Sequence, residues 1–173
     1  DWTASSLEIC TKSFVHSFEI SSSTFKTLER RFSSNERVKL NNIGLSNESK
    51  EIVFKNYGKN SGHSTLIKNS TFCDNYEDFS MTSANVITGD EYCKKNNIDS
   101  IRLLKVDVEA AEHLVLEGFR QMLEASKIDV IQFEYVFTHS DAKFLYQDFY
   151  SLLGPLGYKM GPLKPSGVLF MEF

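Results

Sequence analysis

The hydrophobic residues of this chain follow two spacings in turn, which predict alternating strands and helices. Apolar residues at every second position, or in short unbroken runs, predict strands. These strands are expected at 14–20, 37–45, 51–57, 84–88, 100–108, 128–136 and 167–173. Helical spacing predicts a helix at the start of the chain, further helices at 21–32, 89–98 and 109–123, and one that contains Leu145 and Leu156. The polar segment 58–83 follows neither spacing and is expected to form a long loop.

Strands that alternate with helices are typical of a doubly wound, mostly parallel sheet that is flanked by helices on both faces. The chain has 173 residues, of which 41% are hydrophobic, and this is enough for the core of one domain spanning 1–173. In sheets of this class, ligands bind beyond the carboxyl ends of the strands. The residues that directly follow each predicted strand are therefore the candidates for function.

Composition and charge argue against several classes of function. The formal net charge is -4 and no run of lysine and arginine occurs, which argues against nucleic acid as a partner. The 3 cysteines form no CxxC pair, so neither a disulfide framework nor a zinc site is expected, and reduced thiols fit a cytoplasmic protein. No two histidines have metal-ligand spacing with an acid, so no metal site is expected. No apolar run is long enough to span a bilayer.

Acidic residues end three of the predicted strands: Glu19, Asp107 with Glu109, and Glu134. A single carboxylate after a strand is more often a helix N-cap or a surface charge than a functional group. Three acidic strand ends that meet at one edge of one sheet change this balance, because clustered carboxylates are costly unless they bind a ligand or share protons. The sequence therefore predicts a functional site at this edge.

Several motifs occur in a recognisable order: VHSFEISSSTFKTLERRF, VKLNNIGLSNESKEIVF, SGHSTL, VITGDEYCKKNNIDSIRLLKVDVEAAEHLVLEGF and VIQFEY. Together they resemble the FkbM family of S-adenosylmethionine-dependent methyltransferases, over nearly the whole chain to about Tyr158. The most specific part, LLKVDVEAAEHLVLEG, looks like the family's strand ending Lys-Ile-Asp-Val-Glu-Gly and its helix with a Glu-Val-Leu-x-Gly run. Two residues depart from the family pattern, since Ala110 replaces the usual glycine and Ile20 the usual proline.

The resemblance implies a Rossmann-like class I methyltransferase that uses S-adenosylmethionine to methylate an oxygen atom of a sugar or another small hydroxylated acceptor. It implies that Glu19, followed by Ile20, binds the ribose hydroxyls of the cofactor. Asn42 and Ile43 look like the segment that contacts adenine. Asp107 would lie near the methionine part of the cofactor and the methyl group that is transferred.

On the substrate side, the resemblance implies a role for Glu109, and His63 in the long loop could also contact the acceptor. A general base assists methyl transfer to a hydroxyl group. The candidates for this base are Asp107, Glu134 and His139, in that order. Each has a structural alternative, namely an N-cap for Asp107, a salt bridge for Glu134 and simple solvent exposure for His139. For His139 the structural alternative is the favoured one.

One motif of such methyltransferases has no counterpart in this sequence. It is the turn Asp-Val-Gly-Ala-Asn-x-Gly after the first strand, where the backbone approaches the cofactor and any Cβ would obstruct it. We therefore expect a domain without its first strand, truncated also at the C-terminus, in which the exposed edges of the neighbouring strands make the isolated domain poorly soluble or unstable. The alternative function is an inactive or incomplete Rossmann-like domain that serves only as a binding or structural module. A nicotinamide-dependent oxidoreductase fits less well, because GxGxxG is also absent.

Overall fold

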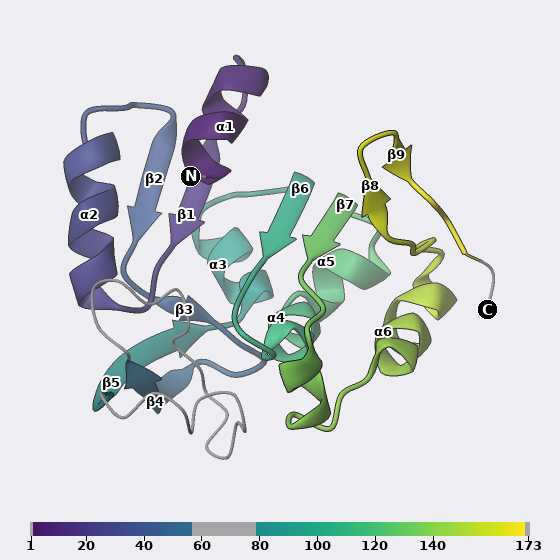
Figure 1. Cartoon of the computed structure of the whole chain (residues 1–173). Coiled ribbons are helices and arrows are strands. Elements are labelled where there is room, and N and C mark those ends of the chain that lie inside the picture. The colour runs from purple at the N-terminus through teal and green to yellow at the C-terminus, as the bar shows by residue number, and fades with distance from the viewer. Residues whose placement is uncertain (1, 57–78, 172–173) are drawn as a thin grey trace.

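The computed structural model describes residues 2–56 and 79–171 of the chain (Figure 1). Its first elements are α1 (Trp2–Ile9), β1 (Val15–Phe18), α2 (Ser22–Phe32), β2 (Val38–Asn41), β3 (Gly44–Leu45), β4 (Lys50–Asn56) and β5 (Ser80–Ile87). There follow α3 (Gly89–Lys95), β6 (Ile101–Val106), α4 (Glu112–Gly118), α5 (Arg120–Glu124), β7 (Ile128–Phe133), the 3-10 helix η2 (Phe137–Ser140), α6 (Tyr146–Leu153), the 3-10 helix η3 (Gly154–Leu156), β8 (Leu163–Lys164) and β9 (Gly167–Val168). Strands and helices are thus mixed along the chain, which confirms the expected α/β class.

Two parallel strand pairs form the centre of the molecule. β1 pairs with β2, beginning with Val15 opposite Val38, and β6 pairs with β7, beginning with Ile101 opposite Ile128. Figure 1 shows the four strands in the spatial order β2, β1, β6, β7, with all four arrows pointing the same way. The carboxyl ends of both pairs therefore lie on the same side of the molecule.

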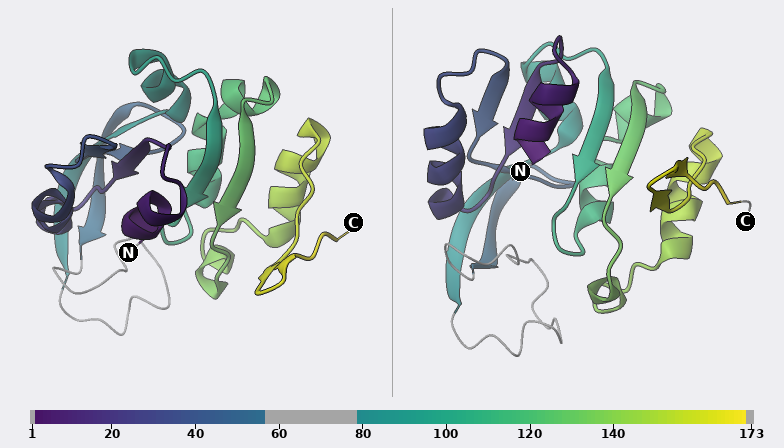
Figure 2. Two further views of the ribbon diagram at one scale, coloured as in Figure 1. Left: turned by 90° about the horizontal axis from the view of Figure 1, so that it is seen from above. Right: turned by 45° about the horizontal axis from the view of Figure 1, so that its top comes forward.

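The single continuous sheet that the sequence predicts is not found among the described residues, which form four small sheets. β1 and β6 face each other across the centre of Figure 1, but no described strand forms a ladder with both (Figure 2). Adjacent strands must lie about 4.8 Å apart to share hydrogen bonds, so these two pairs remain separate sheets. β5 forms a third sheet, in which it runs parallel to β3 and antiparallel to β4.

The main hydrophobic core lies between the β6–β7 pair and helices α3 to α6. Leu104 and Val106 of β6 are buried in it, whereas the alternate residue Leu103 is 40% exposed. This alternation is expected of a strand with one covered face. The other buried members of the core are Cys93, Val115, Leu116, Phe119, Leu123, Ile128, Phe149, Leu153 and Met160.

The single helix predicted at 109–123 is two helices, α4 and α5, with a break at Phe119. The break has a tertiary cause, because Asp90 of α3 caps the start of α5. Its carboxylate oxygens accept hydrogen bonds from the backbone N–H groups of Gln121 at 2.8 Å and Met122 at 3.0 Å. A negative charge at a helix N-terminus satisfies amides that have no partner within the helix.

Two predictions about the ends of segments were wrong. The predicted loop at 58–83 ends earlier, because β5 begins at Ser80 and pairs with β4 from Asn56 onward. The described part of the last segment, residues 167–171, is not a long strand of the main sheet. Gly167 and Val168 form a short hairpin with β8, and the backbone N–H groups of Leu169 and Met171 donate to the carbonyls of Pro162 and Met160. The antiparallel hairpin satisfies these backbone groups locally, so they form no ladder with β6 or β7.

Gly118, at the end of the motif LVLEG, lets α4 approach the segment after β3. A Cβ atom on Gly118 would lie 2.0 Å from the carbonyl oxygen of Ser46, which no real contact allows. Gly89 makes a similar approach, since its Cβ would lie 2.4 Å from the ring of Phe119. These two glycines hold α3, α4 and the β3 segment close together, next to the carboxyl ends of the central strands.

We expect Gly118→Ala to destabilise the protein by about 3 kcal/mol or more, because the added methyl group must displace backbone rather than a flexible side chain. Urea unfolding monitored by circular dichroism measures the change. Gly154→Ala is the matched control, since its Cβ would meet nothing nearer than the Tyr150 ring at 3.4 Å. The control should leave the free energy of unfolding unchanged or raise it by up to about 1 kcal/mol. Equal stabilities of the two variants would contradict the assigned contact.

Candidate functional site

A network of polar contacts around Glu19 joins the carboxyl ends of β1 and β2. The backbone N–H of Glu19 donates to the carbonyl of Asn41 at 3.0 Å, which extends the pairing of these strands by one residue. The side-chain N–H group of Asn42 donates to the carbonyl of Glu19 at 2.8 Å and reaches that of Ile20 at 3.4 Å. Its side-chain oxygen accepts from the hydroxyl of Ser22 at 3.0 Å. The structure thus brings Glu19, Ile20 and Asn42 together, and the Asn42 side chain fixes the two strand ends to each other.

The side chain of Glu19 is half-buried and held by the backbone at the start of α2. Its Oε1 atom accepts a hydrogen bond from the N–H of Ser21 at 2.7 Å. Burial raises the pKa of Glu19 above its ordinary value, and the N–H groups of Ser21 and Ile20 offset only part of this effect. An ionised carboxylate has about four acceptor sites, so these donors leave capacity for the hydroxyl groups of a ligand.

Three carboxylates and one ammonium group gather at the carboxyl ends of β6 and β7. Asp107 follows β6, and Glu134 follows β7, where its N–H donates to the carbonyl of Val106 at 3.3 Å. The Nζ atom of Lys105 lies 2.6 Å from Oδ2 of Asp107. The charges of Asp107 and Glu109 both act on the Glu134 carboxyl group. The parallel strand pair therefore brings together the acids that the sequence predicts at these two strand ends.

The pKa of Glu134 is raised above its ordinary value near 4.5. Desolvation is the largest cause, although the Glu134 side chain is exposed to solvent, followed by the nearby Asp107 carboxylate and the charge of Glu109, while Lys105 acts in the opposite direction. Two carboxyl groups can form a hydrogen bond only when one of them carries a proton. Asp107 and Glu134 can therefore share a proton, and such a pair can exchange a proton with a hydroxyl group beside it.

His139 does not lie on the open side of this cluster, nor is it exposed to solvent, because the structure buries it completely at 0% exposure. Its Nε2 atom lies 2.9 Å from Oε2 of Glu112, which is itself 1% exposed. Burial lowers the pKa of His139, but the Glu112 carboxylate, the Val136 carbonyl and Glu134 together raise it above its ordinary value. The solvent exposure that the sequence favoured for His139 was therefore wrong, and the side chain forms an internal ion pair instead. His63 lies outside the described residues.

Sequence reasoning missed two charged residues near the site, Lys105 and Glu112. The strand alternation places Lys105 two residues before Asp107, and this spacing could have indicated their contact. Glu112 lies four residues before Leu116 and seven before Phe119, on the stripe that the structure buries. A charged residue on a buried helical stripe needs a partner. That signal could have identified Glu112, although the sequence does not name His139 as its partner.

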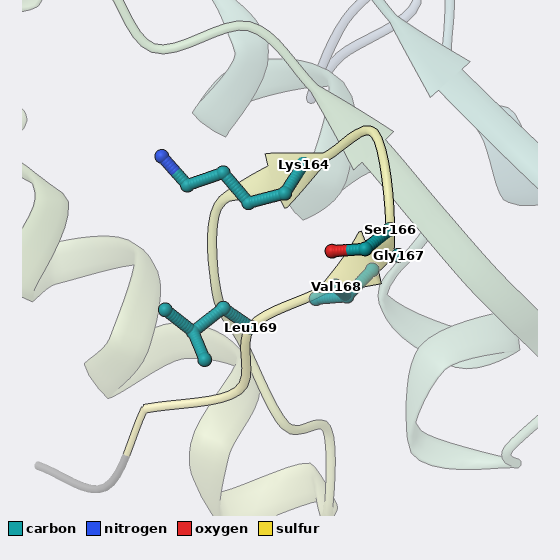
Figure 3. A pocket seen from close by; sticks show the side chains of 5 residues that line it. All are labelled: Lys164, Ser166, Gly167, Val168 and Leu169. Carbon is teal, nitrogen blue, oxygen red and sulfur yellow. The ribbon is translucent and has the colours of Figure 1, made fainter.

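Other features of the described residues do not coincide with this site. A pocket lined by Lys164, Ser166, Gly167, Val168 and Leu169 lies within the β8–β9 hairpin and contains none of the strand-end acids (Figure 3). Over residues 2–56 and 79–171, no group of three or more histidine, cysteine or acidic residues is placed to hold a metal ion. Within the same residues, every helix is too short or too polar to cross a membrane.

We expect Glu134→Gln to stabilise the protein at neutral pH. Folding raises the pKa of Glu134, so the folded state binds the proton of this group more tightly than the unfolded state does. Ionised Glu134 therefore destabilises the folded protein. This destabilisation grows as the pH rises from about 4 through the raised pKa. The neutral glutamine removes this cost, so thermal denaturation at pH 7.5 should show a rise of about 1–3 °C in Tm that vanishes near pH 4. Glu124→Gln, which removes an exposed partner of Arg120, should give no such rise. A lower Tm for Glu134→Gln at pH 7.5 would contradict the inferred repulsion between Glu134 and the neighbouring acids Asp107 and Glu109.

Comparison with known proteins identifies the family of this chain. Residues 1–160 match the Methyltransferase FkbM domain, which is most of the chain and includes both strand-end clusters. No curated protein and no solved structure matches the chain significantly. The chain therefore belongs to the FkbM family of methyltransferases, which use S-adenosylmethionine as the methyl donor.

Proposed function

We propose that this methyltransferase acts on a hydroxyl group of a sugar or another small hydroxylated acceptor, with the carboxyl pair of Asp107 and Glu134 as the general base. The observation that carries this proposal is the gathering of Asp107, Glu134 and the Lys105 ammonium group at the carboxyl ends of β6 and β7. A hydroxyl group must lose its proton when its oxygen is methylated. An acceptor of this type therefore needs the proton-accepting group that the pair provides.

The described residues fit the nucleoside half of the cofactor. Glu19 is half-buried at the end of β1, is oriented by the Ser21 N–H, and keeps acceptor capacity for two neighbouring hydroxyl groups. We assign the ribose hydroxyls to Glu19 and the adenine to the segment with Ile20 and Ile43. Asn42 supports this segment through its hydrogen bonds to the carbonyl groups of Glu19 and Ile20.

When bound, S-adenosylmethionine supplies an electrophilic methyl group on a sulfonium sulfur. Asp107 and Glu134 would accept the hydroxyl proton of the acceptor as its oxygen bonds to the methyl carbon and the bond from that carbon to sulfur breaks, which leaves a neutral thioether. Lys105, 2.6 Å from Asp107, limits the build-up of negative charge in the pair. We assign Glu109 to the orientation of the acceptor, since its charge lies close enough to Glu134 to influence it. Alignment of the acceptor hydroxyl with the methyl carbon supplies the larger part of the rate gain.

A second candidate function is a module that binds partners without catalysis. Two observations favour it: the sequence has no acidic glycine-rich turn of the kind described above, and the facing edges of β1 and β6 have no strand partner among the described residues. The two functions differ in one simple property, because a non-catalytic module need not bind the cofactor. Titration of the protein with S-adenosylhomocysteine by isothermal calorimetry distinguishes them, and no detectable binding at millimolar ligand would contradict the enzymatic proposal.

We expect Glu19→Ala to weaken the binding of S-adenosylhomocysteine about 10- to 100-fold, because it removes charge-assisted hydrogen bonds to the ribose. Isothermal calorimetry measures the change. Glu36→Ala is the matched control, since Glu36 is an exposed acid near the opposite, amino-terminal end of the same strand pair. The control should bind as the wild type does. Equal affinities of Glu19→Ala and Glu36→Ala would remove Glu19 from the cofactor site.

We expect Glu134→Gln to lower the rate of methyl transfer about 100-fold or more, because the pair can no longer accept the hydroxyl proton. The affinity for S-adenosylhomocysteine should stay within a factor of about three, since Glu134 belongs to the acceptor side. Transfer of a radioactive methyl group to a panel of sugars and other polyols, with Glu124→Gln as the control variant, measures the rate. A wild-type rate for Glu134→Gln would show that another group, or none, takes the proton.

A further inference from the structure

The segments that carry the strand-end acids diverge soon after they leave the sheet. The β6–β7 ladder ends with Val106 opposite Phe133, followed by the bond from the Glu134 N–H to the Val106 carbonyl. Beyond this point the first segment leads into α4 and the second into η2. The backbone ladder therefore does not fix the distance between the side chains of Asp107 and Glu134.

Glu112 closes the first of these segments on itself. Its Oε1 atom accepts a hydrogen bond from the backbone N–H of Val108 at 2.9 Å, across the turn that leads into α4. Within this turn, Glu109 and Ala110 adopt left-handed backbone conformations, with φ of 54° and 72°. Such a conformation is unfavourable for a residue with a Cβ atom, so it persists only where the surroundings impose it. The Glu112–Val108 bond is one such constraint.

His139 closes the second segment in the same manner. Its Nδ1 atom lies 3.1 Å from the backbone nitrogen of Val136 and 3.0 Å from the carbonyl oxygen of the same residue. The remaining ring nitrogen, Nε2, faces Oε2 of Glu112 at 2.9 Å. The geometry of this last contact is that of an ion pair rather than of an aligned hydrogen bond. An unbroken series of contacts thus runs from Val108 through Glu112 and His139 to Val136.

The surroundings of this pair argue for a role other than stability. Glu112 and His139 are 1% and 0% exposed, and a buried ion pair contributes little net stability compared with apolar side chains of the same size. Such a pair does restrict geometry, because each partner is bonded to the backbone of one segment. Apolar side chains would fill the space without bonding to Val108 or Val136.

We propose that Glu112 and His139 form a buried positioning pair, which holds the 108–112 and 136–139 segments at a fixed separation and thereby keeps the Asp107 carboxylate close enough to act on Glu134. This positioning matters for catalysis only if the proposed function holds, in which Asp107 and Glu134 take the acceptor proton. The positioning itself is a property of the protein without cofactor or acceptor. It can therefore be tested separately.

The test measures the coupling between the two acids by carbon-13 NMR of their side-chain carboxyl groups. Coupling is defined as the shift in the titration midpoint of Glu134 that Asp107→Asn causes within a given background. In the wild type this shift is expected to be clear. In the Glu112→Met/His139→Leu background, which keeps the packing but removes the backbone contacts, it should fall by about half or more. Both titrations that define the coupling are measured in the same background. The direct effect of removing the charges of Glu112 and His139 is therefore the same in both, and it cancels in the difference.

Leu153→Ala is the control for a merely structural effect, because Leu153 is 1% exposed in the same core but belongs to neither segment. It should lower the Tm and leave the coupling at its wild-type size. If the double variant does not fold, His139→Asn replaces it, since the shorter side chain can take the place of Nδ1 at Val136 but does not reach Glu112, and a reduced coupling is again expected. Full coupling in either folded variant overturns the proposal. This outcome is distinct from failure of the proposed function, which the cofactor titration reports independently.

Discussion

The parallel pairing of β6 with β7 is the constraint on which the proposed site depends. Parallel strands in register begin and end together, so the residues that follow Val106 and Phe133 leave the sheet side by side. Both of these segments begin with acids, and adjacent negative charges repel each other unless a proton or a cation lies between them. The Lys105–Asp107 ion pair and the raised pKa of Glu134, which favours a proton on that group, are the local response to this repulsion.

The side chains packed beneath the strand-end acids restrict where these acids can lie. His139 packs among aromatic rings, with the centroid of Tyr135 at 4.8 Å and that of Phe149 at 5.6 Å. Phe149 stacks on Phe133, the last residue of β7, with centroids 4.5 Å apart. These rings exclude water from the Glu112–His139 contact, and electrostatic interactions are stronger where the dielectric constant is low. The apolar core supplies the stability, and the polar pair restricts where the two segments can lie.

The residues at strand ends could be predicted from the sequence, because the position of a strand depends on the local pattern of apolar residues. The alternation in SIRLLKVDV and IDVIQFEYV is strong, so β6 and β7 were predicted together with the acids that follow them. The burial of His139 could not be predicted, because a histidine near a strand end does not belong to a repeating apolar pattern. The break between α4 and α5 was equally hidden, since the capping group, Asp90, belongs to a different helix.

By itself, the sequence determined the mixed α/β class, most of the strands and helices, the family resemblance and the acids at the strand ends. These features depend on spacing and residue type along the chain, which short-range physical rules describe. Only the tertiary structure decided that the strands form separate small sheets, that Gly118 contacts the carbonyl of Ser46, and that Glu112 pairs with His139. Each of these outcomes depends on contacts between segments far apart in the chain, and the pattern within one segment does not specify its partner.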